Sequence, residues 1–221
     1  MTIRIASLFV ITVLCLTLAA VPAVADTLYS NGPGNFDTDA WTINFGFSVS
    51  DSFQVADSSV IQDLHFVYWD ASGSDVLTTV DMQLGTTSFG GGTQTLHGVT
   101  NTFIGINSYG YSIFQADYTF TGVPWSGDGF ITLSNACTTS GCSVSNPIYW
   151  DENSGVGCSS PGCPSIAYEN TIGSIPSETF TLTGTTGTGT GTGGTTPEPA
   201  SILLFGSGVL GIAGVLRRRL M

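Results

Sequence analysis

The stretch "YSIFQADYTF", residues 111–120, decides the fold class, because its apolar residues recur at every second position. The side chains that share one side are Phe114, Ala116, Tyr118 and Phe120. The polar residues Gln115, Asp117 and Thr119 lie between them. A period of two is that of a β-strand with one buried face, so this stretch predicts a strand packed against a core.

Similar patterns recur through the same part of the chain. The further candidate strands are "WTINFGFSV" (41–49), "DSFQV" (51–55), "VIQDLHFVYW" (60–69), "DVLTTVDMQL" (75–84), "GFITLSNA" (129–136) and "ETFTL" (178–182). Turn-forming clusters such as "NGPGN" and "FGGGT" separate them, and no helix is indicated between residues 26 and 196. We therefore expect an all-β fold, an antiparallel β-sandwich that is most simply a jelly roll.

The two ends of the sequence differ from this region. Arg4, an apolar run and the Ala-Val-Ala at 23–25 predict a secretory signal peptide over residues 1–25, which implies export. A lipoprotein signal at Cys15 is disfavoured, since Leu14 stands where a small residue should precede the cysteine. The β-sandwich domain is then expected over residues 26–183, in an oxidising compartment.

Charge excludes two classes of partner. All four basic residues lie outside residues 26–196, and fifteen of the sixteen acids lie inside that range. Nucleic acid and anionic lipid are bound through Lys and Arg, so we expect neither as a partner of the domain. The simplest role of the acidity is solubility outside the cytoplasm.

Four cysteines form two similar sequences, "CTTSGC" at 137–142 and "CSSPGC" at 158–163. Four cysteines allow three disulfide connectivities. The glycine before each second cysteine favours two local rings, Cys137 with Cys142 and Cys158 with Cys163. A four-cysteine zinc site is the alternative, disfavoured because no C-x2-C spacing occurs.

The segment 184–196, "GTTGTGTGTGGTT", reads as a flexible linker. It is followed by Pro197-Glu198-Pro199, an apolar segment at 200–216 long enough to be a transmembrane helix, and Arg217-Arg218-Arg219. By the positive-inside rule the arginines would stay in the cytoplasm and the acidic domain outside.

These three elements in this order resemble the PEP-CTERM sorting signal of Gram-negative bacteria, here over residues 197–221. The resemblance implies an inner-membrane intermediate, an exosortase-like membrane peptidase as partner, and delivery to the cell surface or extracellular polysaccharide matrix. The alternative is a plain tail anchor. The domain itself resembles, more weakly, strand-rich domains of uncharacterised function that are joined to this signal.

The sequence contains better candidates for binding residues than for catalytic residues. Trp69, Trp125 and Trp150 fall at expected strand ends or loops, where aromatic rings can stack on sugars. For each, a partly buried core position is the structural alternative. The only histidines are His65 and His97, and the one acid cluster worth testing follows Trp150 in "YWDENSG", so we expect no enzyme.

One loop could hold a metal ion. In "WDASGSD" the carboxylates of Asp70 and Asp75, with two serines between them, place hard oxygen ligands at alternating positions, as Ca²⁺ prefers. An ordinary Asp/Ser/Gly turn explains the same residues, and no other cofactor is indicated. The sequence thus predicts an exported, noncatalytic surface or matrix protein. A carbohydrate-binding (lectin-like) module is the second reading and a secreted glycan-active enzyme the third.

Overall fold

A computed structural model describes residues 25–73, 75–142 and 145–187, and these residues form strands and loops without a helix. The strands are β1 (Asp26–Ser30), β2 (Ala40–Thr42), β3 (Ser48–Asp70), β4 (Leu77–Gly85), β5 (Gly92–His97), β6 (Thr100–Ile106), β7 (Ser112–Thr138), β8 (Ile148–Asp151), β9 (Ala167–Glu169), β10 (Gly173–Ile175) and β11 (Phe180–Thr185). All pairings between them are antiparallel, which confirms the predicted all-β class.

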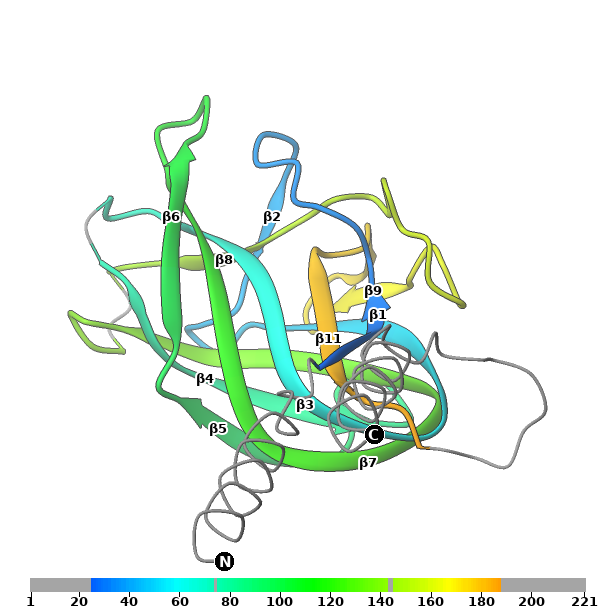
Figure 1. The fold of residues 1–221 in the computed structure, drawn as a ribbon. Helices are drawn as coiled ribbons and strands as arrows, with labels where there is room; N and C mark the ends of the chain where they lie inside the picture. The colour runs from blue at the N-terminus through cyan, green and yellow to red at the C-terminus, as the bar shows by residue number, and fades with distance from the viewer. Residues whose placement is uncertain (1–24, 74, 143–144, 188–221) are drawn as a thin grey trace, which may run out of the picture. The chain divides into compact units, whose positions relative to one another are not determined.

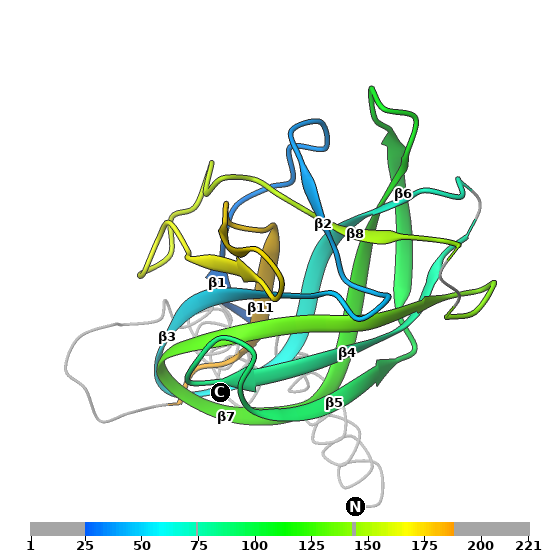
Figure 2. The ribbon, with the colours of Figure 1, turned by 180° about the vertical axis from the view of Figure 1, so that it is seen from behind.

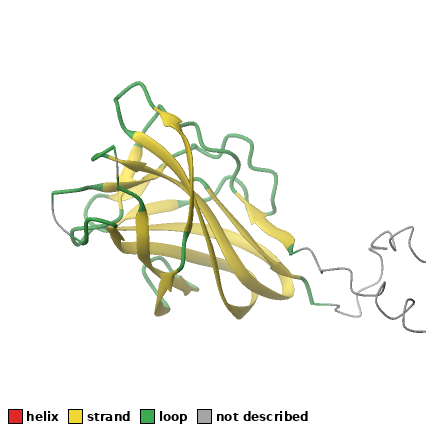
Figure 3. Cartoon of the chain, turned by 60° about the vertical axis from the view of Figure 1, so that its left-hand side comes forward, coloured by secondary structure: helices red, strands yellow, loops and turns green. Residues whose placement is uncertain are grey.

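Two strands, β3 and β7, organise the domain. They pair with each other along almost their whole lengths, from Ser48 opposite Ser134 to Asp70 opposite Ser112. The register slips between Val55 and Ser59, which marks a β-bulge, and bulges bend and twist a strand. Figure 1 shows the pair as long, strongly curved ribbons, and Figure 3 shows that the described residues form strands and loops.

The bend divides the sheet into two layers that share one core. Layer A contains the 59–70 half of β3 and the 112–125 half of β7, with β6, β11, β1, β8 and β2 attached. Layer B contains the other halves of β3 and β7, with β4, β5, β9 and β10. The two layers make the predicted sandwich, and they are continuous because β3 and β7 run through both.

Alternation decides which side chains enter the core. Phe114, Ala116 and Tyr118 of β7 are buried in the main cluster, and Phe120 packs against it, as their spacing predicts. Phe66 and Tyr118 stack from adjacent strands with ring centroids 6.3 Å apart. Layer B contributes Val80, Met82 and Leu133, among others, to the same cluster.

Several predicted strands have different limits in the structure. "WTINFGFSV" is not one strand: β2 ends at Thr42, and Phe45 and Gly46 have φ angles of 62° and 88° in a turn before β3. Conversely, "DSFQV" and "VIQDLHFVYW" join in β3, and "YSIFQADYTF" and "GFITLSNA" join in β7. Bulges, not turns, lie between the joined pieces.

The last strand extends into the segment predicted to be linker. In β11, Gly184 lies opposite Ile61 of β3, and the Gly187 N–H donates to the Ser58 carbonyl at 2.8 Å. A Cβ at position 184 would collide with the Val60 carbonyl oxygen, so only glycine allows this close approach. The packed chain therefore continues past residue 183.

Layer A is covered on its outer face as well. Phe66 and Tyr68 point into the main core, so Val67 and Trp69 point the other way, where they form a second cluster with Ile113. Phe36 of the β1–β2 connection and Ala40, the first residue of β2, pack on this cluster. The outer face of layer A positions the candidate site described below.

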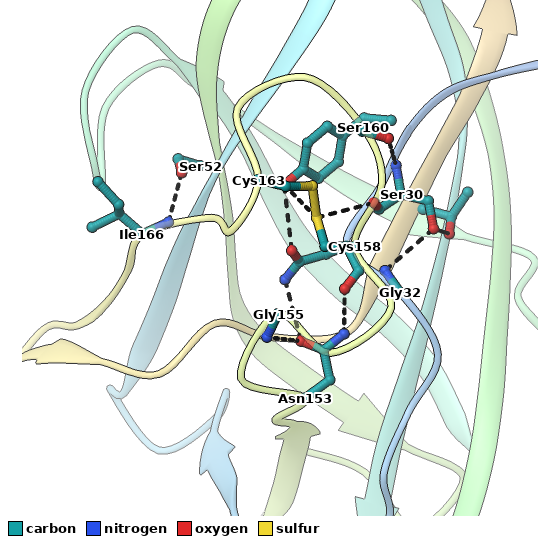
Figure 4. The surroundings of a disulfide bond; sticks show 12 residues. Ser30, Gly32, Ser52, Asn153, Gly155, Cys158, Ser160, Cys163 and Ile166 are labelled. Carbon is teal, nitrogen blue, oxygen red and sulfur yellow. Dashed lines mark hydrogen bonds between the residues drawn. A yellow bond between two sulfur atoms is a disulfide. The ribbon is translucent and has the colours of Figure 1, made fainter.

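Both local disulfides are formed: Cys137–Cys142 links the end of β7 to the loop that follows it, and Cys158–Cys163 lies between β8 and β9. Figure 4 shows how the second ring is held against its neighbours. The Ser30 N–H donates to Ser160 Oγ at 2.9 Å, and the Ile166 N–H donates to Ser52 Oγ at 2.7 Å. These contacts join the loop to β1 and β3.

We expect the mature protein to show no free thiol. A thiol reagent applied under denaturing conditions without reductant should label none of the four cysteines of the domain, and peptide mapping should link 137 with 142 and 158 with 163. Each ring closes a very short loop, so reducing either bond should cost less than the ~3 kcal/mol of a 15-residue loop. Stoichiometric labelling or bound zinc would contradict the assignment.

Residues 1–24 of the predicted signal peptide, the greater part of the predicted linker, and the predicted transmembrane helix at 200–216 lie outside the described residues. Within residues 25–73, 75–142 and 145–187, no helix is long and apolar enough to cross a membrane.

Candidate functional site

An aromatic pocket of about 360 Å³ opens on the outer face of layer A. It is lined by Thr38, Asp39, Ala40, Trp69, Tyr109, Tyr111 and Tyr149. Trp69 is the next-to-last residue of β3, Tyr149 lies on β8, and Tyr109 and Tyr111 precede β7. Figure 2 shows β8, β2 and the β6–β7 connection on this side of the domain.

Strand register places the first two rings side by side. In the β3–β8 ladder, Trp69 lies opposite Tyr149 and Tyr68 lies opposite Trp150. Opposite residues share a face of the sheet, so Trp69 and Tyr149 both point outward while Tyr68 and Trp150 both point into the core.

A turn built by Asn107 places the other two rings. The Asn107 side-chain oxygen accepts the N–H groups of Tyr109 at 3.1 Å and Tyr111 at 2.9 Å. Gly110, between the two tyrosines, has a φ of 87° that favours glycine. The Asn107 amide also donates to the Phe36 carbonyl at 3.1 Å, which ties this turn to the β1–β2 connection.

The four rings form one continuous aromatic surface. Trp69 stacks with Tyr109 at a centroid distance of 6.0 Å and with Tyr111 at 5.8 Å. Tyr149 approaches Tyr111 at 5.7 Å with the planes tilted by 59°. Tyr109 is 61% exposed whereas Trp69 is 5% exposed, so the surface has a fixed base and an accessible rim.

A buried carboxylate fixes Trp69. Its indole N–H donates to Asp151 Oδ1 at 2.6 Å, and Asp151 Oδ2 accepts the Asn35 N–H and the Thr179 hydroxyl, each at 3.2 Å. Burial raises the pKa of Asp151 to about 6, against the lowering effect of the hydrogen bonds it accepts. Trp69 therefore has one defined orientation, which a stacking surface requires.

The three tryptophans predicted as sugar contacts do not lie in one site. Trp69 lines the aromatic pocket, but it is buried there and not an exposed ring at a strand end. The assignment of Trp150 to an exposed site is wrong: it is fully buried, its indole N–H donates to the Thr179 carbonyl at 2.7 Å, and it packs on Phe66 and Phe180. A Trp150→Ala variant would therefore report on the core, not on binding.

Trp125 lies apart from the other two, at the bend of β7. Its ring is half-buried and packs on Phe53 at 5.6 Å. It also lines a shallow hollow with Pro124 and residues 58–60 of β3. Because a Cβ at Gly129 would collide with both Phe53 and Trp125, this tryptophan has a structural role in the bend.

The two aspartates predicted as calcium ligands accept hydrogen bonds from groups in the surrounding loops. Asp70 accepts the Ser72 hydroxyl and the Asp75 N–H, the arrangement of an Asx-type turn. Asp75 is buried and accepts the Ser140 hydroxyl at 2.8 Å and the Asn146 amide at 2.7 Å. No group of three His, Cys, Asp or Glu side chains in the described residues is placed to hold a metal ion.

The histidines lie away from the aromatic pocket. His65 is on the outer face of layer A, with Nδ1 2.6 Å from Asp117 Oδ1, while His97 ends β5. The acids after Trp150 are buried, so "YWDENSG" is an internal segment. All four cysteines of the described residues are in disulfides.

Sequence reasoning missed the three tyrosines and Asn107. The signal present was "NSYGY" at 107–111, a turn sequence with two aromatic residues around a glycine. Aromatic residues in a turn, where no core is available to bury them, are candidates for contact with a ligand.

Comparison with known proteins adds one match. Residues 195–219 match the family model described as the PEP-CTERM protein-sorting motif, and these residues include Pro197, Glu198, Pro199 and Arg217, Arg218, Arg219. No curated protein matches the chain. The chain therefore carries the PEP-CTERM sorting motif, which implies an exported protein that is processed by an exosortase, a membrane peptidase, on its way to the cell surface.

Proposed function

We propose that the β domain of this surface protein is a noncatalytic module that binds extracellular polysaccharide in the aromatic pocket. The observation that carries the proposal is the continuous surface of Trp69, Tyr109, Tyr111 and Tyr149. A sugar ring has an apolar C–H face and a rim of hydroxyls. Aromatic faces suit the first, and a few placed polar groups suit the second.

The dimensions of the pocket support a ligand of saccharide size. About 360 Å³ lies at the lower end of the ~300–1,000 Å³ that small-molecule sites occupy. Thr38 and Asp39, both exposed, supply hydroxyl and carboxylate groups at its edge. Tyr109 presents its ring to solvent, so an incoming sugar need not displace protein from it.

A second hollow beside the pocket favours a ligand that is a polysaccharide chain over one that is a single sugar. Phe36 and Asp37, which precede Thr38 directly, line a hollow of about 170 Å³ with residues 104–107 and Ile113. Thus one short loop lines both hollows. A chain of linked sugars could contact both sides of this loop.

The lining of the pocket favours binding over cleavage. Glycosidic hydrolysis uses a pair of carboxyl groups that flank the scissile bond. Asp39 is the one acid among the residues that line the aromatic pocket, and Asp151 is buried behind Trp69 with its oxygens hydrogen-bonded. We therefore place a glycan-active enzyme last among the three alternatives.

Replacing Tyr109 by Ala should weaken polysaccharide binding about tenfold. The variant removes the most exposed ring, and tenfold corresponds to ~1.4 kcal/mol, within the range expected when stacking and buried area are both lost. Binding is measured by titration calorimetry with the oligosaccharides that a glycan array identifies for the exported protein.

Phe89→Ala is the matched control, because Phe89 is 37% exposed in the β4–β5 turn outside the pocket. Phe89→Ala should bind like the unsubstituted protein. The melting temperatures of both variants should lie within a few degrees of that of the unsubstituted protein. Absence of binding to any polysaccharide, or equal affinities for all three proteins, would refute the proposed function.

A further inference from the structure

We propose that the aromatic pocket selects a protonated amino group, so that its ligand is a polysaccharide that contains unacetylated amino sugars. This inference rests on the proposed function and names the class of sugar. It is drawn from the arrangement of the four rings, from the acid at the edge of the pocket, and from the absence of Lys and Arg in residues 26–196.

The first argument is the aromatic composition of the walls. The face of an aromatic ring carries negative charge density and attracts a cation placed within about 6 Å of the ring centroid. Trp gives the strongest attraction, followed by Tyr, and groups of such rings recognise quaternary ammonium ligands. Here one Trp and three Tyr rings surround a single pocket.

The second argument is the acid at the edge. Asp39 lines the pocket and is exposed, so its carboxylate can pair with an ammonium group without a large desolvation cost. Asp37, two residues earlier, accepts the Ser108 N–H at 2.8 Å, and this hydrogen bond lowers its pKa. Both hollows along the loop therefore carry a negative edge.

The third argument concerns ligands that are disfavoured. Residues 26–196 contain fifteen acids and no Lys or Arg, and both histidines lie outside the lining of the pocket. A uronic acid or sulfated sugar would meet only like charge there. Like-charge contact reduces both association rate and affinity, so the field of the domain rejects anionic polysaccharides.

A comparison of three oligosaccharides tests the inference. The probes are hexamers of β-1,4-linked glucosamine, of β-1,4-linked N-acetylglucosamine, and of galacturonic acid, titrated into the exported protein at pH 6, where a primary amine is protonated. We expect the glucosamine hexamer to bind about tenfold more tightly than its N-acetylated form, and the galacturonic acid hexamer not to bind. The preference should shrink when salt rises from 50 to 500 mM, since salt screens exposed charges.

Variants separate the pocket from the overall charge of the domain. Asp39→Asn should reduce the preference for the amine about fivefold. Asp57→Asn makes the same charge change at an exposed site in the bend of β3 and should leave the preference unchanged. Equal effects of the two variants would assign the preference to general attraction and overturn the inference.

The remaining outcomes distinguish the two proposals. If the N-acetylated hexamer, or another neutral glycan, binds as tightly as the amine and Tyr109→Ala weakens it, the amine inference is wrong and the proposed function stands. If no oligosaccharide binds, both are wrong.

Discussion

Between pH 5 and pH 8 the melting temperature of the β domain is expected to fall by at least ~10 °C, and Glu178→Gln is expected to reduce that fall. Glu178 is fully buried, and neither of its carboxylate oxygens has a hydrogen-bond partner among the residues that the structure describes. Burial is the largest cause that raises its pKa, followed by the nearby acids Asp51, Glu152, Asp151 and Asp39. No Lys or Arg between residues 26 and 196 can compensate a negative charge there.

Burial also raises the pKa of two neighbouring acids. Asp51 is fully buried and accepts the Glu178 N–H at 2.7 Å, yet burial still raises its pKa to about 7. For Asp151, burial raises the pKa to about 6. The interior of the domain therefore holds several carboxyl groups that keep their protons at pH values where exposed carboxyls have lost them.

The sign of the pH dependence follows from proton counting. Unfolding releases these groups to ordinary pKa values near 4, so above pH 4 the folded state binds more protons than the unfolded state. Stability is then fully present at low pH and is lost as pH rises through about 6 and 7 and beyond. For each proton that the folded state binds in excess, a rise of one pH unit lowers the free energy of unfolding by ~1.4 kcal/mol. In a domain of this size, each kcal/mol changes the melting temperature by ~2–4 °C.

Calorimetric scans at pH 5, 6, 7 and 8 measure the effect in the parent protein, Glu178→Gln and Asp128→Asn. Gln has the shape of Glu without its charge, so the slope should flatten. Asp128 is exposed, and its variant should keep the parental slope. A melting temperature constant or rising over this range, or the same slope in all three proteins, would contradict protonation of Glu178. So would a melting temperature raised by Ca²⁺ and lowered by a chelator, since a bound cation would then balance the charge.

The sequence predicted the strands that alternate clearly but not their lengths. "YSIFQADYTF" has one apolar face, and its buried positions follow from that pattern alone. The segments "VADSS" and "WSGDG" look like turns because they are rich in Ser, Gly and Asp. In the structure they are bulged parts of β3 and β7, and a bulge uses the same flexible residues as a turn.

Only part of the aromatic pocket could be predicted from the sequence. Trp69 and Trp150 both end apolar runs, and nothing local distinguishes them. Pairing across β8 decides that Trp69 faces outward and Trp150 inward, and such register is a tertiary property. Likewise, Tyr149 and Tyr109 are about forty residues apart, and only the connection of β8 to layer A brings them into one pocket.

Replacing Pro197, Glu198 and Pro199 by Ala should leave export intact while unprocessed protein accumulates in the inner membrane. The sorting motif at residues 195–219 includes all three residues, and cleavage by an exosortase is expected near them. Each proline favours an extended backbone in the residue before it, the form in which peptidases usually hold a substrate. The effect should be nearly complete, because a peptide that does not fit the enzyme is not cleaved at a useful rate.

Intact-mass measurement of protein from the cell exterior and from the inner membrane distinguishes processing from simple anchoring. The parental surface form should lack the apolar segment 200–216, and the triple variant should retain it in the membrane fraction. Replacing Thr190 and Thr192 by Ala is the matched control, since both residues precede the sorting motif at 195–219. The expectation of removal rests on the composition of the segment. Its four glycines weaken a helix but allow close approach to a partner helix, which suits docking to a membrane enzyme better than permanent anchoring. A triple variant that reaches the surface with the parental processed mass would place the cleavage determinants elsewhere and exclude Pro-Glu-Pro as the recognition element.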